Sequence, residues 1–587
     1  MSGCRVAAAF SSRPFARLRW AAFLIGALLL PAALFAQAAP LEDSVEARAA
    51  EALKLARSGA TEAALEIYQD LAAREPDNMA LIRDYAVVLS WAEKYREAIP
   101  FARRAQQLAP EQPDWALKDF SAIYLFGDAL LDALGTLGEL IRRGDATEQT
   151  LIRRALALRW MGRDDDAVEA YERALSLYPG SADGLAGLAY SLADSGNFSR
   201  ALSELDRAPA ASRNSAAAQR ARIRILNWMG RHYEAQRMIA GLSPELRDDR
   251  EILEDRVAAF RWGGNPTGAM RDARRLVTLY PTEANRRMSS ELRAEYGQWT
   301  TSGFRFSRDV DGLTDRSLSQ EATVHLTPSQ AIRAGYQYRW YQFAGEERTL
   351  VRYDAGWNGA VGSRLYFYTT LSGVDYRAGS PDRKLIGDGS MEWALNDSLR
   401  LTAGGGKIAM DAYQSLPNQV TAPFAFVHLS IAPDPADRFQ GRYGRYVFSD
   451  GVVRDRGDLE YSRTLVAESG VKLKAGWRSN LLWHDEQTAD FFSPRSFQSH
   501  LAVAQGNGAV THWLDYSGEV AVGWQLEQGA STLHPLQFSG SVLLHPGRYW
   551  RMTVSAGRST SSVDRVTPGQ YIYSRWTVGA SMEFRLS

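Results

Sequence analysis

The chain has 587 residues, with 68 lysines and arginines, 68 aspartates and glutamates, and one cysteine. A chain this long exceeds one ordinary core, so two or more domains are expected. Its formal charge of zero argues against a general nucleic-acid-binding protein, and the single cysteine excludes a disulfide framework.

The first 38 residues have the three parts of a Sec signal peptide. An apolar run at residues 20–36 follows several arginines and leads into an Ala-Gln-Ala site that ends at Ala38. We expect cleavage after Ala38. The alternative, a membrane anchor, is disfavoured because the run is short and contains Pro31. Cys4 would leave with the signal, and no later stretch is apolar for long enough to form a membrane-spanning helix.

Residues 39–283 contain a repeat of about 34 residues. The segments EAALEIYQDLAAREP, DAVEAYERALSLYP and GAMRDARRLVTLYP share one pattern, and prolines close them at matching offsets. This pattern resembles the tetratricopeptide repeat (TPR), in which a small residue lets two helices approach closely and proline ends the second helix. The sequence therefore predicts a TPR solenoid of about seven repeats, the third one degenerate. The repeating small residues are Ala64, Ala98, Ala133, Ala167, Ala201, Ala235 and Ala269.

A solenoid of this kind presents a curved concave surface, so binding of a partner is its expected role. The inner-helix positions that would face this groove include Arg83, Arg159, Asp183 and Tyr190. The alternative for each residue is an ordinary solvated helix face. The repeat region shows no catalytic constellation.

After an expected linker at residues 284–296, the sequence period changes from about 3.6 to 2. In residues 297–587, segments of about ten to fifteen residues alternate polar and apolar side chains between turn residues; the last one, RWTVGASMEFRL, alternates throughout. About sixteen such segments and ten of the sixteen tryptophans lie in this half, which is typical of a closed antiparallel transmembrane β-barrel. A soluble β-sandwich or propeller is the alternative, but the polar face here is charged in strand after strand.

The combination of signal peptide, TPR solenoid and C-terminal barrel resembles the exopolysaccharide export porins of the outer membrane, which include the poly-β-1,6-N-acetylglucosamine exporters and, more distantly, the outer-membrane subunits of cellulose synthase. Within the barrel, Phe491, Phe492, Ser493, Pro494 and Phe497 match an aromatic-aromatic-Ser/Asn-Pro-x-x-aromatic segment found in such barrels. A loop whose proline enters a strand is the alternative. This chain has fewer repeats than those families commonly carry.

The resemblance implies an outer-membrane porin that exports an exopolysaccharide, such as poly-N-acetylglucosamine or a similar biofilm polymer, through the barrel lumen. The TPR domain would lie in the periplasm and bind the polymer, polysaccharide-modifying proteins or inner-membrane synthase components. Outer-membrane lipid would surround the barrel, and no nucleic acid, cofactor or metal is expected. The strand alternation gives candidate lumen-lining residues: Asp458, Glu460, Lys472, Lys474, Arg478, Asp515, Glu519, Arg575 and Glu583.

Two other functions remain open at this stage. The barrel could serve only as an anchor for a scaffold that recruits periplasmic proteins, in which case its lumen would be plugged. It could also be an enzyme acting on lipid, but no spacing pairs a histidine with a nucleophile and an orienting carboxylate. Metal-binding patterns such as His-x-x-x-His are absent from the sequence. We therefore expect no enzymatic activity.

Overall fold

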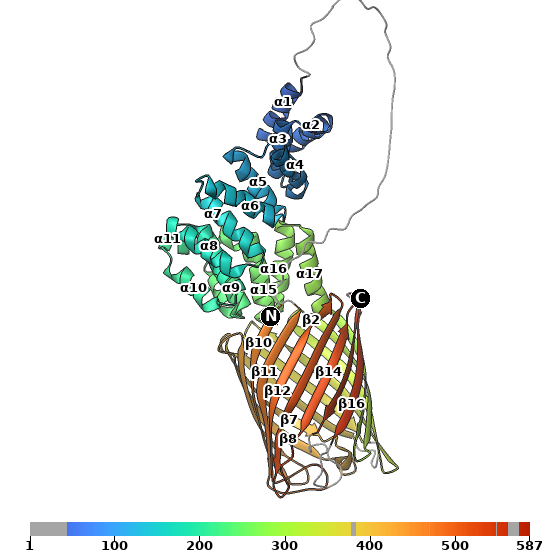
Figure 1. Cartoon of the computed structure of the whole chain (residues 1–587). Coiled ribbons are helices and arrows are strands. Elements are labelled where there is room, and N and C mark those ends of the chain that lie inside the picture. Colours follow the sequence, from blue (N-terminus) through green and yellow to red (C-terminus); the bar gives the residue numbers. More distant parts are fainter. Residues whose placement is uncertain (1–43, 377–382, 469, 548, 561–573, 587) are drawn as a thin grey trace, which may run out of the picture. The chain divides into compact units, whose positions relative to one another are not determined.

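The computed structural model describes residues 44–376, 383–468, 470–547, 549–560 and 574–586. The expected cleavage site after Ala38 lies outside these residues. The described chain consists of helices followed by a closed antiparallel barrel of sixteen strands (Figure 1), so the predicted fold class is confirmed. Its contacts divide it into two compact units, one ending at Ile225 and the other beginning at Leu226.

The first unit is built from helices arranged as antiparallel pairs. We call the first helix of each pair the inner helix and the second the outer helix. The inner helices are α1 Val45–Arg57, α3 Met79–Trp91, α5 Asp114–Phe126, α7 Glu148–Trp160, α9 Ala182–Asp194 and α12 Ala216–Trp228, the last of which crosses the division between the units. The outer helices are α2 Thr61–Arg74, α4 Tyr95–Leu108, α6 Leu130–Arg142, α8 Asp164–Leu177 and α10 Phe198–Arg207, followed by the short α11 Ala210–Arg213.

The repeating alanines explain how the two helices of a pair pack. All seven alanines of the series from Ala64 to Ala269 are fully buried, because each lies where the outer helix meets its inner partner. A larger side chain at these positions would push the two helices apart. Gly187 shows the same closeness between α8 and α9, since a Cβ atom there would lie 2.3 Å from the ring of Tyr171.

The second unit begins with more helices of the same kind: α13 His232–Ala240, α14 Pro244–Arg247, α15 Arg250–Trp262, α16 Pro266–Leu279 and α17 Glu283–Glu295. The expectation of a linker at residues 284–296 is wrong, because α17 occupies nearly all of it. Thr282 caps this helix by accepting a hydrogen bond from the backbone N–H of Asn285, and Leu292 is buried against the preceding repeat. No helix of the described chain is both long enough and apolar enough to cross a membrane.

The barrel closes by pairing its first strand with its last. Every neighbouring pair is antiparallel, and the closing pair runs from Gln298 opposite Leu586 to Asp309 opposite Arg575. Its strands are β1 Gln298–Asp309, β2 Thr314–Thr327, β3 Gln330–Phe343, β4 Glu346–Val361, β5 Leu365–Asp375, β6 Arg383–Ala394, β7 Leu399–Ala409, β8 Thr421–Ile431, β9 Asp437–Val447, β10 Val453–Glu468, β11 Val471–His484, β12 Ser496–Thr511, β13 Leu514–Glu527, β14 Leu536–Leu544, β15 Trp550–Ser559 and β16 Arg575–Leu586.

The outer face of the barrel carries exposed apolar side chains along the strands, as a lipid-facing surface requires. We call the end where β1 follows α17 the helix end and the opposite end the loop end. Exposed tryptophans lie near both ends, where interfacial aromatic belts are expected. They are Trp357, Trp393 and Trp513 near the helix end, and Trp483, Trp524 and Trp576 near the loop end.

At the helix end, turns of the barrel bind the helices of the same unit. Asp397, in the turn between β6 and β7, accepts hydrogen bonds from the backbone N–H groups of Tyr233 and Glu234 at 2.8 and 3.1 Å. These amides belong to the second and third residues of α13 and have no partner within the helix, whose own N-cap residue supplies no side-chain acceptor. The Tyr233 hydroxyl also donates to the Ser363 carbonyl at 2.7 Å. The barrel thus supplies the N-terminal cap of α13.

Burial also perturbs titratable groups in this contact region. His232, the first residue of α13, is buried, and its Nδ1 lies 3.3 Å from Oδ1 of Asn227. Desolvation, with a smaller contribution from the Arg400 guanidinium, lowers the pKa of His232 to about 4. The imidazole is therefore neutral at physiological pH.

Candidate functional site

Each of the nine candidate lumen residues is next to an exposed apolar side chain on its strand, the alternation expected of an inward-facing position. Exposed Leu459 separates Asp458 from Glu460 on β10, and exposed Trp576 follows Arg575 on β16. The same alternation places the rest inward: Lys472, Lys474 and Arg478 on β11, Asp515 and Glu519 on β13, and Glu583 on β16.

An arginine ties three strands of the wall together. Arg478 donates from Nη1 and Nη2 to the two oxygens of Glu519 at 3.0 and 3.2 Å, across the intervening strand β12. Its Nε lies 3.6 Å from Glu460 on β10, and Gln505 of β12 donates to Glu519 at 2.7 Å. The single positive charge of Arg478 therefore lies beside two carboxylates and offsets part of their negative charge within the wall.

Other inward charges are paired in the same way. Asp458 accepts hydrogen bonds from Asn480 at 2.8 Å and from Arg456 at 2.9 Å. Glu583 forms a two-point ion pair with Arg551 of β15, with distances of 2.7 and 2.6 Å. Such pairs keep donors and acceptors in fixed positions along the wall while adding little net charge.

Near the helix end, Asp515 Oδ2 lies 3.0 Å from Nε2 of His545, which belongs to the turn after β14. Lys472 and Lys474 lie on the inward face of β11, in the half of the strand that begins at the helix end. The inward wall therefore carries charges of both signs along its length.

At the loop end, the buried side chain of Asp315 forms ion pairs with three arginines. Asp315 of β2 accepts from Arg339 at 2.8 and 2.6 Å and from Arg575 at 2.7 Å, and Arg305 lies 3.3 Å away. Arg339 also forms an ion pair with Asp411, outside the strands. The sequence identified Arg575 but missed its partners, because cross-strand register, which joins β16 to β1 and β2, cannot be read from alternation alone.

The connection between β7 and β8, residues 410–420, packs against inward-facing residues of this end. The Tyr341 hydroxyl donates to the Asp411 carbonyl, and the guanidinium of Arg348 lies 3.9 Å from the centre of the Tyr413 ring. Arg348 also donates to the Tyr413 carbonyl at 2.7 Å, and Leu416 is buried beside Tyr341. Burial raises the pKa of the Tyr413 phenol. This loop therefore covers part of the inner wall.

The aromatic segment identified in the sequence lies in the connection between β11 and β12. Phe491 is buried, its ring centre 4.4 Å from that of Phe448, and the Arg454 guanidinium lies 5.0 Å from the Phe491 ring. The Pro494 carbonyl lies 2.7 Å from Nδ1 of His484, and β12 begins two residues later. The segment is thus a loop whose proline leads into a strand, packed against β10 and β11.

The remaining aromatic residues of the segment hold the start of β12. Phe492 and Phe497 meet edge to face at 5.5 Å, while the Ser493 hydroxyl donates to the Thr488 carbonyl at 3.2 Å. The two inner-wall loops also contact each other, because Asn418 donates to Asp490 at 2.7 Å.

One serine and one histidine meet on the outward face of the barrel. The Ser479 hydroxyl is hydrogen-bonded to Nδ1 of His500 on the neighbouring strand, and the other nitrogen of His500 lies 3.5 Å from the Gln498 amide oxygen. Ser479 is only 1% exposed, and the third group is an amide rather than a carboxylate. The arrangement fits a cross-strand hydrogen bond that satisfies polar groups on the lipid-facing surface.

In the first unit, the structure brings two of the four groove candidates together. The guanidinium of Arg159 lies 4.8 Å from the centre of the Tyr190 ring and forms an ion pair with Asp194 at 2.7 Å. Arg83, on another repeat, pairs with Asp84 and lies over the ring of Trp115. Asp183 is exposed in the first turn of α9.

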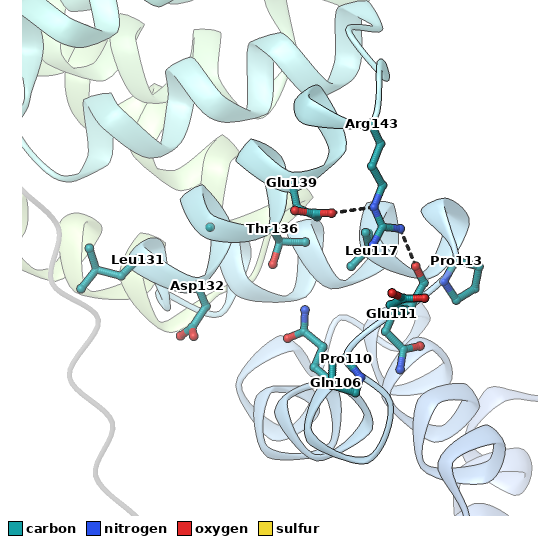
Figure 2. Close-up of a pocket in the computed structure, with 12 residues that line it drawn as sticks. Gln106, Pro110, Glu111, Pro113, Leu117, Leu131, Asp132, Thr136, Glu139 and Arg143 are labelled. Atoms are coloured by element: carbon teal, nitrogen blue, oxygen red, sulfur yellow. Dashed lines mark hydrogen bonds and ion pairs between the residues drawn. The ribbon is translucent and has the colours of Figure 1, made fainter.

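An open hollow of about 1010 Å³ lies in the first unit between the end of α4, the start of α5 and one face of α6 (Figure 2). Its lining is mainly polar and includes Glu111, Asp132 and Glu139. Arg143 at the edge donates to Glu139 at 2.7 Å and to the Gln112 carbonyl at 2.7 Å. Within the lining, Glu139 and Arg143 thus form an ion pair, while Asp132 pairs with Arg103 outside it. In the part of the chain that the structure describes, no group of three or more metal-ligating side chains converges.

Comparisons with known proteins identify the repeat. A family model for the tetratricopeptide repeat matches residues 161–225, so the chain contains a TPR region. No curated protein matches the chain significantly.

Among solved structures, a bacterial polysaccharide outer membrane secretin is 12% identical, with 50% of this chain and 99% of that chain covered and a TM-score of 0.44. A tetratricopeptide repeat protein from Parabacteroides merdae is 15% identical, with 42% and 98% covered and a TM-score of 0.37. MamA from Desulfovibrio magneticus is 18% identical, with 28% and 93% covered and a TM-score of 0.26.

Proposed function

We propose that the chain is an outer-membrane porin that exports an exopolysaccharide, poly-N-acetylglucosamine or a similar biofilm polymer, through the barrel lumen. Its TPR helices lie in the periplasm after removal of the signal peptide. There they bind the polymer or the proteins that make and modify it. The observation that carries this proposal is a closed sixteen-strand barrel whose outer face is apolar and whose inner face is lined with charged and polar groups.

The inner wall suits a sliding polymer better than a fixed ligand. A barrel of sixteen strands encloses a lumen wide enough for an extended sugar chain. Paired groups such as Arg478 with Glu519 and Arg551 with Glu583 present donors and acceptors at many points. Many weak contacts permit movement, whereas one tight site would hold the polymer in place. Transport requires no bond-making by the protein.

The test blocks the lumen of the full chain. Because Cys4 is the only cysteine of the sequence, Ser517→Cys introduces a single thiol into the mature protein, at an exposed inward position of β13. A strain that lacks the native protein is complemented with this variant, and its surface is treated with either a small maleimide or a large polyethylene-glycol maleimide. Released and periplasmic polysaccharide are then measured.

We expect the large label to stop polymer release and to leave polymer in the periplasm, while the small label on the same cysteine changes little. The small label is the matched control, because it removes the thiol without filling the lumen. Undiminished release from fully labelled protein would show that polymer does not pass through the barrel.

The alternative function is an anchored scaffold that recruits periplasmic proteins without transport. One observation favours it: the connections 410–420 and 485–495 pack against the inner wall at the loop end and contact each other through Asn418 and Asp490. A scaffold predicts that polymer release does not respond to either label, so the same experiment separates the two functions.

A further inference from the structure

The last residue of the inner helices is aromatic in repeat after repeat. This position carries Trp91 in α3, Phe126 in α5 and Trp160 in α7. In the second unit the same position carries Trp228 in α12 and Trp262 in α15. Two of the inner helices named above differ: α1 ends with Arg57 and α9 with Asp194. We call Trp91, Phe126 and Trp160 the aromatic stripe.

The rings of the aromatic stripe are unusually exposed for their type. Trp91, Phe126 and Trp160 are 46%, 46% and 43% exposed. Within residues 44–225, the other largely exposed aromatic side chain is Trp115, which also belongs to an inner helix. Core packing does not require rings at a surface, so their gathering on three consecutive inner helices indicates a contact surface.

Neighbouring rings and ion pairs hold the stripe in place. Phe126 meets Trp160 edge to face at 6.1 Å, and Tyr95 lies 5.3 Å from Phe126 on its other side. Beside Trp160, Arg159 is fixed by its ion pair with Asp194. The surface thus offers flat apolar rings next to fixed donors and acceptors, with little net charge.

We propose that the aromatic stripe binds the exported polysaccharide by stacking on the faces of its sugar rings. This inference rests on the proposed function and names the surface of the solenoid that recognises the polymer. A pyranose ring has an apolar face of C–H groups that packs on an aromatic ring, while its hydroxyl groups lie at the edge. At that edge, Arg159 and Asp194 can donate and accept hydrogen bonds.

The regularity of the stripe favours a polysaccharide over a peptide. A polymer of identical units meets an aromatic ring in each of the three repeats, as successive bases do on the aromatic platforms of single-strand-binding proteins. A peptide would instead call for pockets of differing size along the groove. The rings of the stripe are exposed to solvent and form only shallow contacts. A moving polymer can therefore bind to them and dissociate from them readily.

The second unit also has an exposed aromatic residue at the end of a helix, Trp262 of α15. Trp262 is 59% exposed, and the Arg261 guanidinium lies 4.7 Å from its ring. The next residue, Gly263, accepts a hydrogen bond from the hydroxyl of Tyr366, a residue of β5 at the helix end. Trp262, at the same repeat position, therefore directly precedes a residue that contacts the end of the barrel.

The test removes the stripe from the full chain with W91A, F126A and W160A combined. Binding of β-1,6-linked glucosamine, β-1,4-linked N-acetylglucosamine and β-1,4-linked glucose oligosaccharides to the purified, detergent-solubilised protein is measured by calorimetry. The matched control combines L131A and L177A, which remove side chains that are 74% and 56% exposed on outer helices. A second variant, W91Y with W160Y, keeps a ring at both positions.

We expect at least one oligosaccharide to bind the native chain, and the triple variant to bind it at least about tenfold more weakly, since an aromatic contact contributes about 0.5–1.5 kcal/mol. The outer-helix control should bind like the native chain, and the tyrosine variant should retain most of the affinity. In cells, the triple variant should release less polysaccharide than the control.

The inference is overturned if none of the oligosaccharides binds the native chain, or if the triple variant binds them as the control does. It is also overturned if the triple variant loses a periplasmic protein partner but keeps sugar binding. Each of these results leaves the proposed function intact as long as the lumen label at position 517 still stops release. If that label has no effect, export through the barrel fails independently of the stripe.

Discussion

The cap that the barrel supplies to α13 can be tested by the substitution Asp397→Ala. Both carboxylate oxygens of Asp397 accept hydrogen bonds from backbone amides, of Tyr233 at 2.8 Å and of Glu234 at 3.1 Å. Loss of an N-cap side chain costs about 0.5–2 kcal/mol, and the loss of a negative charge at a helix N-terminus adds about 0.3–1 kcal/mol. We therefore expect local opening of the N-terminus of α13 to become easier by about 1–2 kcal/mol.

Amide hydrogen exchange measures this opening directly, because the two amides have no partner within the helix. A change of about 1–2 kcal/mol corresponds to exchange that is roughly five- to thirtyfold faster at Tyr233 and Glu234. Asp397→Asn keeps one acceptor oxygen without the charge, so it should give an intermediate rate. Exchange at these two amides that changes less than about twofold in Asp397→Ala would refute the assignment of Asp397 as the cap.

Two further predictions concern the packing of the helices. Gly187→Ala should destabilise the solenoid by about 1–3 kcal/mol, because its Cβ would lie 2.3 Å from the Tyr171 ring; a thermal melt followed by circular dichroism checks this, with Gly180→Ala, which meets no atom within 4 Å, as the control. Acidification should weaken the packing of α13: the folded pKa of His232 is about 4, against about 6.5 unfolded, so the unfolded state gains a proton first as the pH falls from 6.5 towards 4. The loss of stability is at most about 3 kcal/mol. The free energy of opening of α13, obtained from hydrogen exchange after correction for the intrinsic pH dependence of the exchange rate, should be lower at pH 5 than at pH 7.5 in the native chain and change much less in His232→Gln. An equal change in both proteins would contradict the role of His232.

Periodicity made the architecture readable from the sequence. The alanine series at steps of 34 or 35 residues located the helix pairs, because each pair needs a small side chain at its crossing point. In the barrel, alternation predicts an inward face for residues such as Arg478 and Glu519, whose strand neighbours Trp477 and Val520 are exposed. Both patterns depend on local geometry alone, and local geometry is what a single sequence carries.

Contacts that depend on register or on distant segments could not be read in this way. Asp315 meets Arg575, 260 positions later in the sequence, only because β1 pairs with β16, and Asp397 meets Tyr233 across 164 positions. The helix α17 was missed for another reason. Its sequence is rich in charged residues and has only a short apolar face around Leu292, a pattern that predicts a linker rather than a packed helix.

The aromatic stripe could be recognised only in part from the sequence. The recurrence of Trp91, Phe126 and Trp160 at one repeat position was present in the sequence, but exposure distinguishes a contact surface from core residues. Once helix ends are assigned, a bulky ring at the last position of several inner helices is a signal that sequence reasoning can use.

The closing pair of the barrel sets the order in which the protein can assemble. Helix pairs join residues that are close in sequence, so the solenoid can form while the rest of the chain is still unfolded. The pairing of β1 with β16 requires both ends of the strand region, and until it forms, two open edges are exposed to other chains. Arg585 of β16 also donates to the Arg293 carbonyl of α17 at 3.2 Å. The step that closes the barrel therefore also adds this contact with α17, and a chain halted before this step keeps two open strand edges beside its helices.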